Sequence, residues 1–510
     1  MPKPPHALPI LWLLAGVLLV TGFTVSGQDT VPPALDTVVV PGDPDTTPSQ
    51  LLPVPDDGLP SAAERARRAQ AEARGGTVAE RLTSFLGLAV FILLGWFFST
   101  DRSAIQWRVV WWGVTLQFLF ATIILLSGPG RAFFDALNDL FVILIGYTEE
   151  GARFIFGNLV MNNVPVGTAE GPMAPIPEVR AWANTGGYFA FNVLPTIIFF
   201  SSLMTLLYYL GVMQKVVRAF AWVMVRTMKT SGSESLSAAG NIFVGQTEAP
   251  LLVKPFIQTM TNSELHAVMT GGFATVAGGV MAAYVGMLVA FFPDIAGHLI
   301  AASVMSAPAA LAMAKLMYPE TEESVTRGEI KIELENPDAN LIDAAARGAS
   351  EGLFLALNVA AMLLAFIALL ALGNGILGGV GGWIGFPELS IQLLLGWIGA
   401  PFAWLMGTPW QDALAVGVLL GEKMALNEFV AYLHLAELLG AGAELSPRSV
   451  VIATYALCGF ANFSSIAIQI GGISGLAPER RGDLSRVGLR AMFAGTLAAF
   501  MTAAMVGVLL

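Results

Sequence analysis

The feature that most constrains this chain is a series of apolar stretches, each long enough to cross a lipid bilayer as a helix. A membrane-spanning helix needs about 20 consecutive, mostly apolar residues. The clearest stretches are residues 83–99, 109–127, 190–211, 267–291, 297–317, 353–372, 449–470 and 491–509. We therefore predict an all-α polytopic membrane protein with about eight transmembrane helices.

Composition supports this prediction and excludes several other classes of protein. Charged residues make up only 12% of the chain, whereas a soluble domain carries about 25%. The net charge of −11 offers no basic surface for nucleic acid, so no nucleic-acid partner is expected. One cysteine and four histidines exclude an internal disulfide framework and leave little for a metal cluster. No nucleophile–base pair stands out, so we do not expect an enzyme.

The first 82 residues differ in composition from the rest of the chain. An apolar run after Lys3 ends in small residues before Gln28, which predicts a signal peptide at residues 1–27, with an uncleaved anchor helix as the alternative. Residues 28–60 are rich in proline and form a predicted linker outside the cytoplasm. Residues 61–82 mix arginine with glutamate, and we expect a short helix there on the membrane surface.

Basic residues predict the orientation of the helices, because Lys and Arg concentrate in cytoplasmic connections. The basic groups are Arg102 with Arg108, a cluster at residues 215–229 and a cluster at residues 480–490. Placing all three inside gives eight spans with both mature termini outside the cytoplasm, in agreement with an exported N-terminus. The arginines of residues 61–82 oppose an external location, but long translocated segments often escape the rule.

Other segments are expected at the membrane surface. The amphipathic stretches 132–157 and 216–229 are predicted to be interfacial helices. The acidic stretch at residues 320–343 is predicted to be a solvated loop with a short surface helix.

Polar residues gather in residues 235–258, an apolar stretch too interrupted for an ordinary span. Gln246, Thr247 and Glu248 are consecutive there, close to a glycine and a proline. A carboxylate at membrane depth is costly unless it is paired or faces water, and irregular backbone there must line a cavity. We predict a re-entrant helical hairpin that presents these side chains to a polar ligand. The alternative is a loop at the interface whose polar residues are simply solvated.

A second interrupted stretch, residues 408–436, repeats this arrangement with Asn427 and Glu428. Each stretch is followed by a helix with a glycine-rich, polar centre, and the tripeptide Gly-Phe-Ala occurs in both, at residues 272–274 and 459–461. Interrupted hydrophobic segments at corresponding positions of two halves indicate a secondary transporter built from inverted repeats, with its binding site near the bilayer midplane.

The repeats also divide the chain into regions. Residues 83–230 are predicted scaffold helices, and residues 231–510 are a predicted transport core with the two hairpins. The alternative to a transporter is a membrane receptor or enzyme that would use the same binding cavity between the two hairpins. The duplicated carboxylate-bearing turns favour transport, since transport explains both halves whereas a receptor needs only one.

The residue types at these turns limit the classes of substrate that could bind there. The two stretches and the helices after them supply carboxylates, amides and hydroxyls, but no arginine that could clamp an anion. A phosphorylated or carboxylated substrate would need clear positive charge. A neutral, polyhydroxylated solute such as a sugar or a nucleoside fits better.

Three motifs, in this order along the chain, resemble the concentrative nucleoside transporter family. They are Gly245-Gln246-Thr247-Glu248-Ala-Pro250, Gly421-x-Lys423-x-x-x-Asn427-Glu428-Phe429-Val-Ala-Tyr432 and Cys458-Gly-Phe-Ala-Asn462-Phe-Ser-Ser465. Residues 193–202 and 302–308 resemble the family too, so the resemblance covers residues 83–510. It implies a homotrimer of eight-helix protomers in the cytoplasmic (inner) membrane. Each protomer would have two hairpins and import nucleosides with a coupling cation by alternating access.

The resemblance also implies the residues that contact the substrate. The positions expected to face the nucleobase are Gln246, Thr247, Glu248 and Val280. Glu428, Asn462 and Ser465 are expected to hydrogen-bond the ribose hydroxyls, with Phe460 packing nearby. The preference for pyrimidine or purine nucleosides stays open at this point.

For the coupling ion, the resemblance implies sodium between the first hairpin and an unwound part of the next helix. Asn241 and Thr275 would supply side-chain oxygens, and Val244 and Val276 would supply backbone carbonyls. Such oxygen ligands suit a hard cation. Some family members use protons, so a proton-coupled symporter is the alternative, and no other cofactor is expected.

Overall fold

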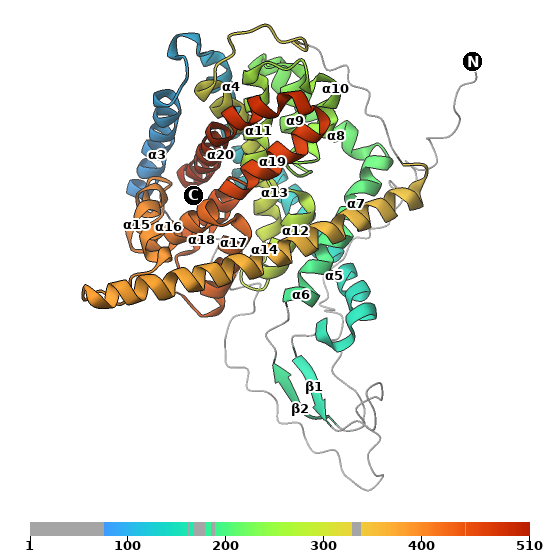
Figure 1. Cartoon of the computed structure of the whole chain (residues 1–510), viewed down its shortest axis with the longest axis vertical. Helices are drawn as coiled ribbons and strands as arrows, with labels where there is room; N and C mark the ends of the chain where they lie inside the picture. Colours follow the sequence, from blue (N-terminus) through green and yellow to red (C-terminus); the bar gives the residue numbers. More distant parts are fainter. Residues whose placement is uncertain (1–75, 161–162, 168–178, 185–188, 329–337, 444) are drawn as a thin grey trace. The chain divides into compact units, whose positions relative to one another are not determined.

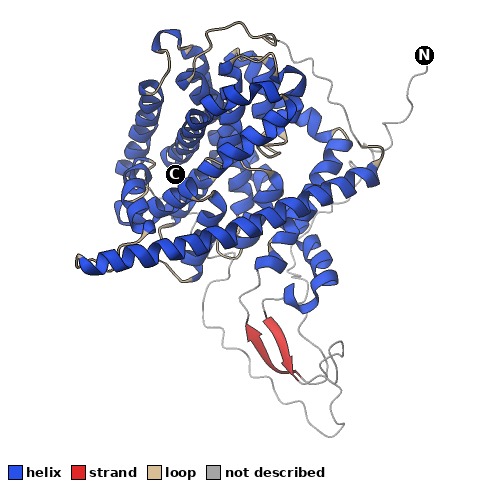
Figure 2. Cartoon of the chain, viewed as in Figure 1, coloured by secondary structure: helices blue, strands red, loops and turns tan. Residues whose placement is uncertain are grey.

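The computed structural model describes residues 76–510, with gaps at 161–162, 168–178, 185–188, 329–337 and 444. The predicted signal peptide at residues 1–27, the linker at residues 28–60 and most of the surface helix at residues 61–82 lie outside the described residues. Helices dominate the described part of the chain, as Figure 2 shows, and the predicted helical class is confirmed.

The helices are labelled in Figure 1. The first group is α3 (Val78–Phe97), α4 (Trp107–Leu126), α5 (Gly128–Phe156), α6 (Phe189–Asn192), α7 (Leu194–Tyr209) and α8 (Val212–Met228). The second is α9 (Gly232–Gly240), α10 (Lys254–Ile257), α11 (Asn262–Ala274), α12 (Gly278–Leu288), α13 (Ile295–Met317), α14 (Leu341–Trp383), α15 (Ile391–Leu405), α16 (Trp410–Ala425), α17 (Glu428–Gly440), α18 (Pro447–Leu457), α19 (Phe463–Leu476) and α20 (Arg481–Leu509). Short 3₁₀ helices in the described residues are η1 (Arg102–Ala104), η2 (Gly157–Val160), η3 (Ala249–Val253) and η4 (Pro478–Arg480).

One antiparallel ribbon departs from the all-α prediction. Its strands, β1 (Asn163–Gly167) and β2 (Val179–Asn184), pair within the connection between α5 and α6. The ribbon was not predicted from the sequence. Since it is confined to a connection, the helical class of the protein does not change.

Within the described residues, seven helical segments are long and apolar enough to cross a membrane. They are Val78–Phe97, Trp107–Leu126, Phe189–Tyr209, Asn262–Leu288, Ile295–Met317, Leu341–Trp383 and Pro478–Leu509. Each overlaps a predicted span. The eighth predicted span, residues 449–470, is not one continuous helix, because α18 ends at Leu457 and α19 begins at Phe463.

The first membrane-spanning helix begins before the predicted start of the first span, inside the predicted surface helix at residues 61–82. Thr77 Oγ1 accepts a hydrogen bond from Glu80 N (3.3 Å), and Glu80 Oε2 accepts one from Thr77 N (2.8 Å). This capping box satisfies two backbone donors that a first helical turn leaves unpaired. Residues 78–82 therefore belong to α3.

The two amphipathic stretches predicted at the surface are both helical. Residues 132–157 lie within or next to α5, and residues 216–229 correspond to α8. Their location at the membrane surface stays a prediction.

The acidic stretch at residues 320–343 begins as the predicted loop, and most of residues 320–328 are exposed. Residues 320–328 form no helix and fold over the starts of α9 and α11. Thr326 is buried, and Ser324 Oγ donates a hydrogen bond of 2.6 Å to Glu264 Oε1. Short hydroxyl side chains make this packing possible, because they can satisfy a buried carboxylate.

The order of helices repeats along the chain. The first half runs through α7, α8, a hairpin of α9 with η3 and α10, the broken pair α11–α12, and α13. The second half runs through α14, α15, a hairpin of α16 with α17, the broken pair α18–α19, and α20. Equivalent helices pack together, α7 on α14 and α13 on α20. The two interrupted stretches are therefore helix–turn–helix units at equivalent places in a repeat.

Candidate functional site

The two helix breaks contact each other through the paired Gly-Phe-Ala segments. Gly459 has a φ of +114°, and a Cβ built on it would lie 2.6 Å from the carbonyl oxygen of Phe273 and 2.8 Å from the carbonyl carbon of Ala274. Only glycine tolerates both this backbone conformation and this approach without strain. The glycine of the second segment thus brings the break between α18 and α19 against the end of α11.

Hydrogen bonds join the first hairpin to α19. Gln246 Nε2 donates to Ser465 Oγ at 3.1 Å, so two of the predicted nucleoside-binding residues lie in contact. Gln469 Nε2 donates to Gln246 Oε1 at 3.0 Å and to the carbonyl oxygen of Met269 at 3.2 Å. All three polar side chains are buried. Their bonds hold Gln246 in one orientation, with its amide aimed into the region between the two halves.

Gln469 was missed by sequence analysis. It lies one helical turn after Ser465 in the apolar sequence of α19, and this spacing places the two side chains on the same face. A buried amide at that spacing from a predicted site residue was the available signal.

The second hairpin supplies the other predicted carboxylate. Glu428 is buried at the start of α17; its Oε1 accepts a hydrogen bond from the hydroxyl of Tyr284 at 3.0 Å, and its Oε2 accepts one from Asn462 Nδ2 at 2.9 Å. Asn462 Oδ1 in turn accepts from the backbone N–H of Ser465 at 2.9 Å, which caps α19. The predicted residues Glu428, Asn462 and Ser465 are therefore brought together.

Tyr284 was also missed. It is fully buried in α12 and stacks on Tyr432, with ring centroids 4.3 Å apart. The Tyr432 hydroxyl donates to the carbonyl oxygen of Thr454 at 2.7 Å. Nothing local in the sequence distinguishes Tyr284 from a core aromatic residue, since its partner Glu428 lies far away in the chain.

Lys423 stabilises the break in the second half. Its buried ammonium donates to the carbonyl oxygens of Ala456 (2.8 Å) and Cys458 (3.4 Å). Carbonyl groups at a helix C-terminus carry partial negative charge and favour a cation. Lys423 therefore caps the end of α18.

The remaining predicted substrate residues lie around this network. Thr247 Oγ1 donates to Glu248 Oε1 at 3.0 Å within the first hairpin turn, where Glu248 is exposed. A Cβ on Gly472 of α19 would lie 3.1 Å from Thr247 Cγ2, so this turn packs on α19. Val280 and Phe460 are both buried, and belong to one apolar cluster.

Two of the predicted ion residues, Asn241 and Thr275, lie next to Gly271 near the ends of α9 and α11. A Cβ built on Gly271 would lie 3.2 Å from Asn241 Nδ2, which itself donates to the carbonyl oxygen of Ser237 at 3.1 Å. The hydroxyl of Thr275 is already engaged, since it donates to the carbonyl oxygen of Gly271 at 2.9 Å. The backbone N–H of Gly278 donates to the carbonyl oxygen of Phe243 at 3.1 Å, which ties the hairpin turn to the break.

One atom of this group stands out chemically. Asn241 Oδ1 is buried and has no hydrogen-bond partner among the described residues. A buried polar oxygen left without a partner costs free energy. Val244 and Val276 lie in non-helical backbone, and carbonyl and amide oxygens are ligands that a small hard cation prefers.

Three family models match most of the helical region. Residues 86–159 match the family described as "Na+ dependent nucleoside transporter N-terminus", and residues 298–507 match its C-terminal counterpart. Residues 190–291 match the family described as "Nucleoside recognition". The chain belongs to the concentrative nucleoside transporter family. The resemblance identified from the three motifs is thereby confirmed.

Relatives within the concentrative nucleoside transporters cover most of this chain. "Solute carrier family 28 member 3" of Mus musculus is 44% identical over 443 residues, which are 84% of this chain and 59% of the relative. "Sodium/nucleoside cotransporter 1" of Rattus norvegicus is 44% identical over 443 residues and is covered to 64%. The chain thus spans about three fifths of the length of these mammalian relatives. An "Uncharacterized transporter" of Haemophilus influenzae is 45% identical over 429 residues and is covered to 97%.

Solved structures of the transporter CNTnw have the same fold as this chain. "CNTnw in an inward-facing substrate-bound state" superimposes with a TM-score of 0.75 at 44% identity, covering 84% of this chain and 97% of the other. A variant of CNTnw in an outward-facing state gives a TM-score of 0.76 at 43% identity, covering 85% and 98%. These relatives are transporters and not enzymes, so a receptor or enzyme in the same cavity is no longer favoured. The chain is a multi-pass membrane protein.

Proposed function

We propose that this protein is a sodium-coupled symporter that imports nucleosides across the cytoplasmic membrane by alternating access. The observation that carries the proposal is one continuous set of hydrogen bonds between the two halves of the repeat. It runs from Gln246 through Ser465 and Asn462 to Glu428. A ligand with a polar ring at one end and hydroxyls at the other would contact both hairpins at once.

At the ribose end, the proposal rests on Glu428. An ionised carboxylate only accepts hydrogen bonds, and its two oxygens can accept from two neighbouring hydroxyls. The hydroxyl of Tyr284 and the amide of Asn462 now occupy those oxygens. Ribose hydroxyls would share or replace these donors, with Ser465 as a further partner. A site built for hydroxyls rejects analogues that lack them.

At the nucleobase end, Gln246, Thr247 and Glu248 offer an amide, a hydroxyl and a carboxylate from one turn. These groups can pair with the donors and acceptors at the edge of a base. Val280 and Phe460 would supply the apolar surface for its faces.

Sodium is the proposed coupling ion, held by Asn241, Thr275 and the backbone carbonyls of Val244 and Val276. The unpartnered Oδ1 of Asn241 supports this assignment. The family's printed description as Na+ dependent supports it as well. Sodium binding would tie the hairpin turn to the helix break, so that the nucleoside meets an ordered site.

The assembly we propose is a homotrimer in the inner membrane, with both mature termini outside the cytoplasm. Support comes from α14 (Figure 1), the longest described helix, which carries many exposed apolar side chains. Leu364, for example, is 76% exposed. Such a surface must face lipid or other protomers. Residues 1–60 would act as an exported leader and linker.

Uptake of radiolabelled uridine into proteoliposomes tests the function. We expect uridine to accumulate under an inward sodium gradient. We expect no accumulation under a proton gradient when the sodium concentration is equal on both sides of the membrane. Accumulation under the proton gradient would keep the nucleoside site and overturn the sodium assignment. Absence of uptake for both uridine and adenosine under either gradient would contradict nucleoside transport itself.

Asn241→Ala is expected to raise the sodium concentration for half-maximal uptake by about tenfold, because it removes the unpartnered oxygen from the ion site. Uridine KM at saturating sodium should stay near that of the unchanged protein. The matched control is Asn358→Ala, an exposed asparagine of α14. An unchanged sodium dependence in Asn241→Ala would remove this residue from the ion site.

Gln469→Leu is expected to raise the uridine KM by about tenfold, since Gln246 loses the donor that orients its amide. Sodium dependence should not change. Gln117→Leu serves as the control: Gln117 is also buried, but it donates to Thr502 Oγ1 in another part of the helical core. If both variants alter KM equally, Gln469 contributes only to general stability.

A further inference from the structure

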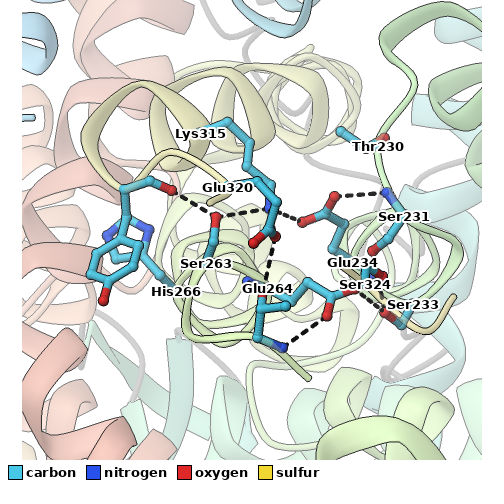
Figure 3. A network of polar contacts seen from close by, with 12 residues as sticks. Thr230, Ser231, Ser233, Glu234, Ser263, Glu264, His266, Lys315, Glu320 and Ser324 are labelled. Carbon is cyan, nitrogen blue, oxygen red and sulfur yellow. Dashed lines mark hydrogen bonds and ion pairs between the residues drawn. The ribbon is translucent and has the colours of Figure 1, made fainter. Parts of the chain in front are cut away.

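A buried ammonium lies near the end of α13, away from the nucleoside network. Lys315 Nζ lies 2.7 Å from Glu234 Oε2 and donates hydrogen bonds to Ser263 Oγ (2.9 Å) and Glu320 Oε2 (3.0 Å). Figure 3 shows this cluster. The three partners belong to α9, α11 and the loop after α13. A single charged group therefore bridges three segments.

The carboxylates around Lys315 also start two helices. Glu234 Oε1 accepts a hydrogen bond from Ser231 N (2.7 Å) in the capping box of α9. Glu264 Oε2 accepts one from Thr261 N (3.0 Å) in the capping box of α11. Ser233 Oγ of α9 donates to Glu264 Oε1 at 3.1 Å, so the two boxes are bonded to each other.

The acidic loop closes over this cluster. Thr261 Oγ1 donates to Glu320 Oε2 at 2.8 Å, beside the contact of Glu320 with Lys315. Ser324 donates to Glu264, and the carbonyl oxygen of Thr326 accepts from Gly232 N at 2.9 Å. The starts of α9 and α11 are thus held together at one place.

Both helices end at the proposed ion site. Glu234 precedes Asn241 by seven positions and Glu264 precedes Thr275 by eleven, which corresponds to about 10 and about 16 Å of helix. The two ends touch where Gly271 faces Asn241. A helix resists compression along its axis, so a shift at its start displaces its end. The Lys315 cluster therefore sets how Asn241 and Thr275 are placed relative to each other.

The positive charge of Lys315 holds the starts of α9 and α11 together, because the carboxylates that it contacts are buried. Glu234, Glu264 and Lys315 are all buried. Removing one partner of a buried ion pair leaves an uncompensated charge, which is strongly destabilising locally. Without the ammonium, the carboxylates that begin α9 and α11 would repel each other or draw in water, and the two helix starts would separate.

We propose that Lys315 is a positioning residue for the coupling ion: it fixes the starts of the two helices whose ends bind sodium, without touching the ion itself. This inference rests on the proposed sodium site. It assigns a role in transport to a cluster that lies outside the nucleoside network and contains no predicted site residue.

The test compares Lys315→Met with Asn241→Ala, Glu320→Gln and Glu323→Gln. We expect Lys315→Met to raise the sodium half-saturation for uridine uptake on the order of tenfold, with uridine KM at saturating sodium unchanged. Glu320→Gln should produce a smaller shift, because Glu234 still pairs with Lys315. Glu323→Gln changes an exposed carboxylate of the same loop and should have no effect.

A paired variant separates positioning from packing. Adding Glu234→Gln to Lys315→Met removes the unpaired carboxylate, and glutamine can still close the capping box. We expect this double variant to recover part of the sodium affinity. Sodium titration of thermal unfolding in detergent provides a readout that does not depend on transport, and Glu320→Gln supplies the comparison should Lys315→Met fail to fold.

Two results would overturn the inference. One is an unchanged sodium half-saturation in Lys315→Met and Glu320→Gln while that of Asn241→Ala rises, which would leave the ion site intact and make the cluster purely structural. The other is a double variant no better than Lys315→Met alone. An unchanged value in Asn241→Ala as well would instead refute the ion site on which the inference rests.

Discussion

Glu428→Gln is expected to weaken uridine transport by about 10- to 100-fold in apparent affinity, the range for hydrogen bonds to a charged group. Glutamine keeps the size of the side chain but replaces one acceptor with an NH₂ donor. That donor would face either the Tyr284 hydroxyl or the Asn462 amide, both of which donate to Glu428. The ribose would also lose one of its two acceptors.

A 2′,3′-dideoxy analogue of uridine distinguishes this role from a general loss of folding. It cannot donate to Glu428, so its transport should be weak in the unchanged protein and fall much less in the variant. Glu437→Gln is the matched control, since Glu437 is an exposed carboxylate on the same helix. Equal losses for uridine and for the dideoxy analogue would refute the ribose assignment.

Gly459→Ala is expected to abolish uptake and to lower the thermal unfolding temperature. The added methyl group would have to occupy a position 2.6 Å from the carbonyl oxygen of Phe273, at a φ of +114° that alanine rarely adopts. Strain of this kind costs of order 1–3 kcal/mol. It would act where the two helix breaks meet, so the nucleoside network would be displaced as well.

Gly475→Ala provides the comparison for this variant. Gly475 lies in α19 with nothing within 4 Å of an added Cβ, so alanine should be neutral or raise stability by about 0.4–1 kcal/mol. Thermal unfolding in detergent and uridine uptake measure both variants. A Gly459→Ala protein with normal unfolding and normal uptake would show that the close approach of the breaks is dispensable.

The helix broken at residues 458–462 marks where prediction from sequence reached its limit. Residues 449–470 are apolar enough to be predicted as one span. The hydropathy of a stretch does not show whether its helix is interrupted in the middle. The break depends on contacts from distant segments. Lys423 binds the carbonyl groups that α18 leaves free, and Gly459 packs on the end of α11.

The start of α3 and one contact of the loop at residues 320–328 could not be predicted, for related reasons. The arginines and glutamates of residues 61–82 indicated a surface helix, whereas the capping box at Thr77 places the start of α3 at Val78. The loop is exposed over most of its length, as predicted. Its serine and threonine side chains also satisfy Glu264, a partner about 60 positions earlier in the chain, which a local pattern does not reveal.

Sequence alone determined the helical membrane class, most of the spans, the family, and the candidate residues at the two turns. These follow from the length of apolar runs and from short motifs, which are local properties. Tertiary structure decided that Gln469 orients Gln246, that Tyr284 bonds Glu428, and that Lys315 joins the starts of α9 and α11. The residues in these contacts are 52 to 223 positions apart in the chain. A local pattern contains no information about which distant groups will satisfy a buried charge or amide.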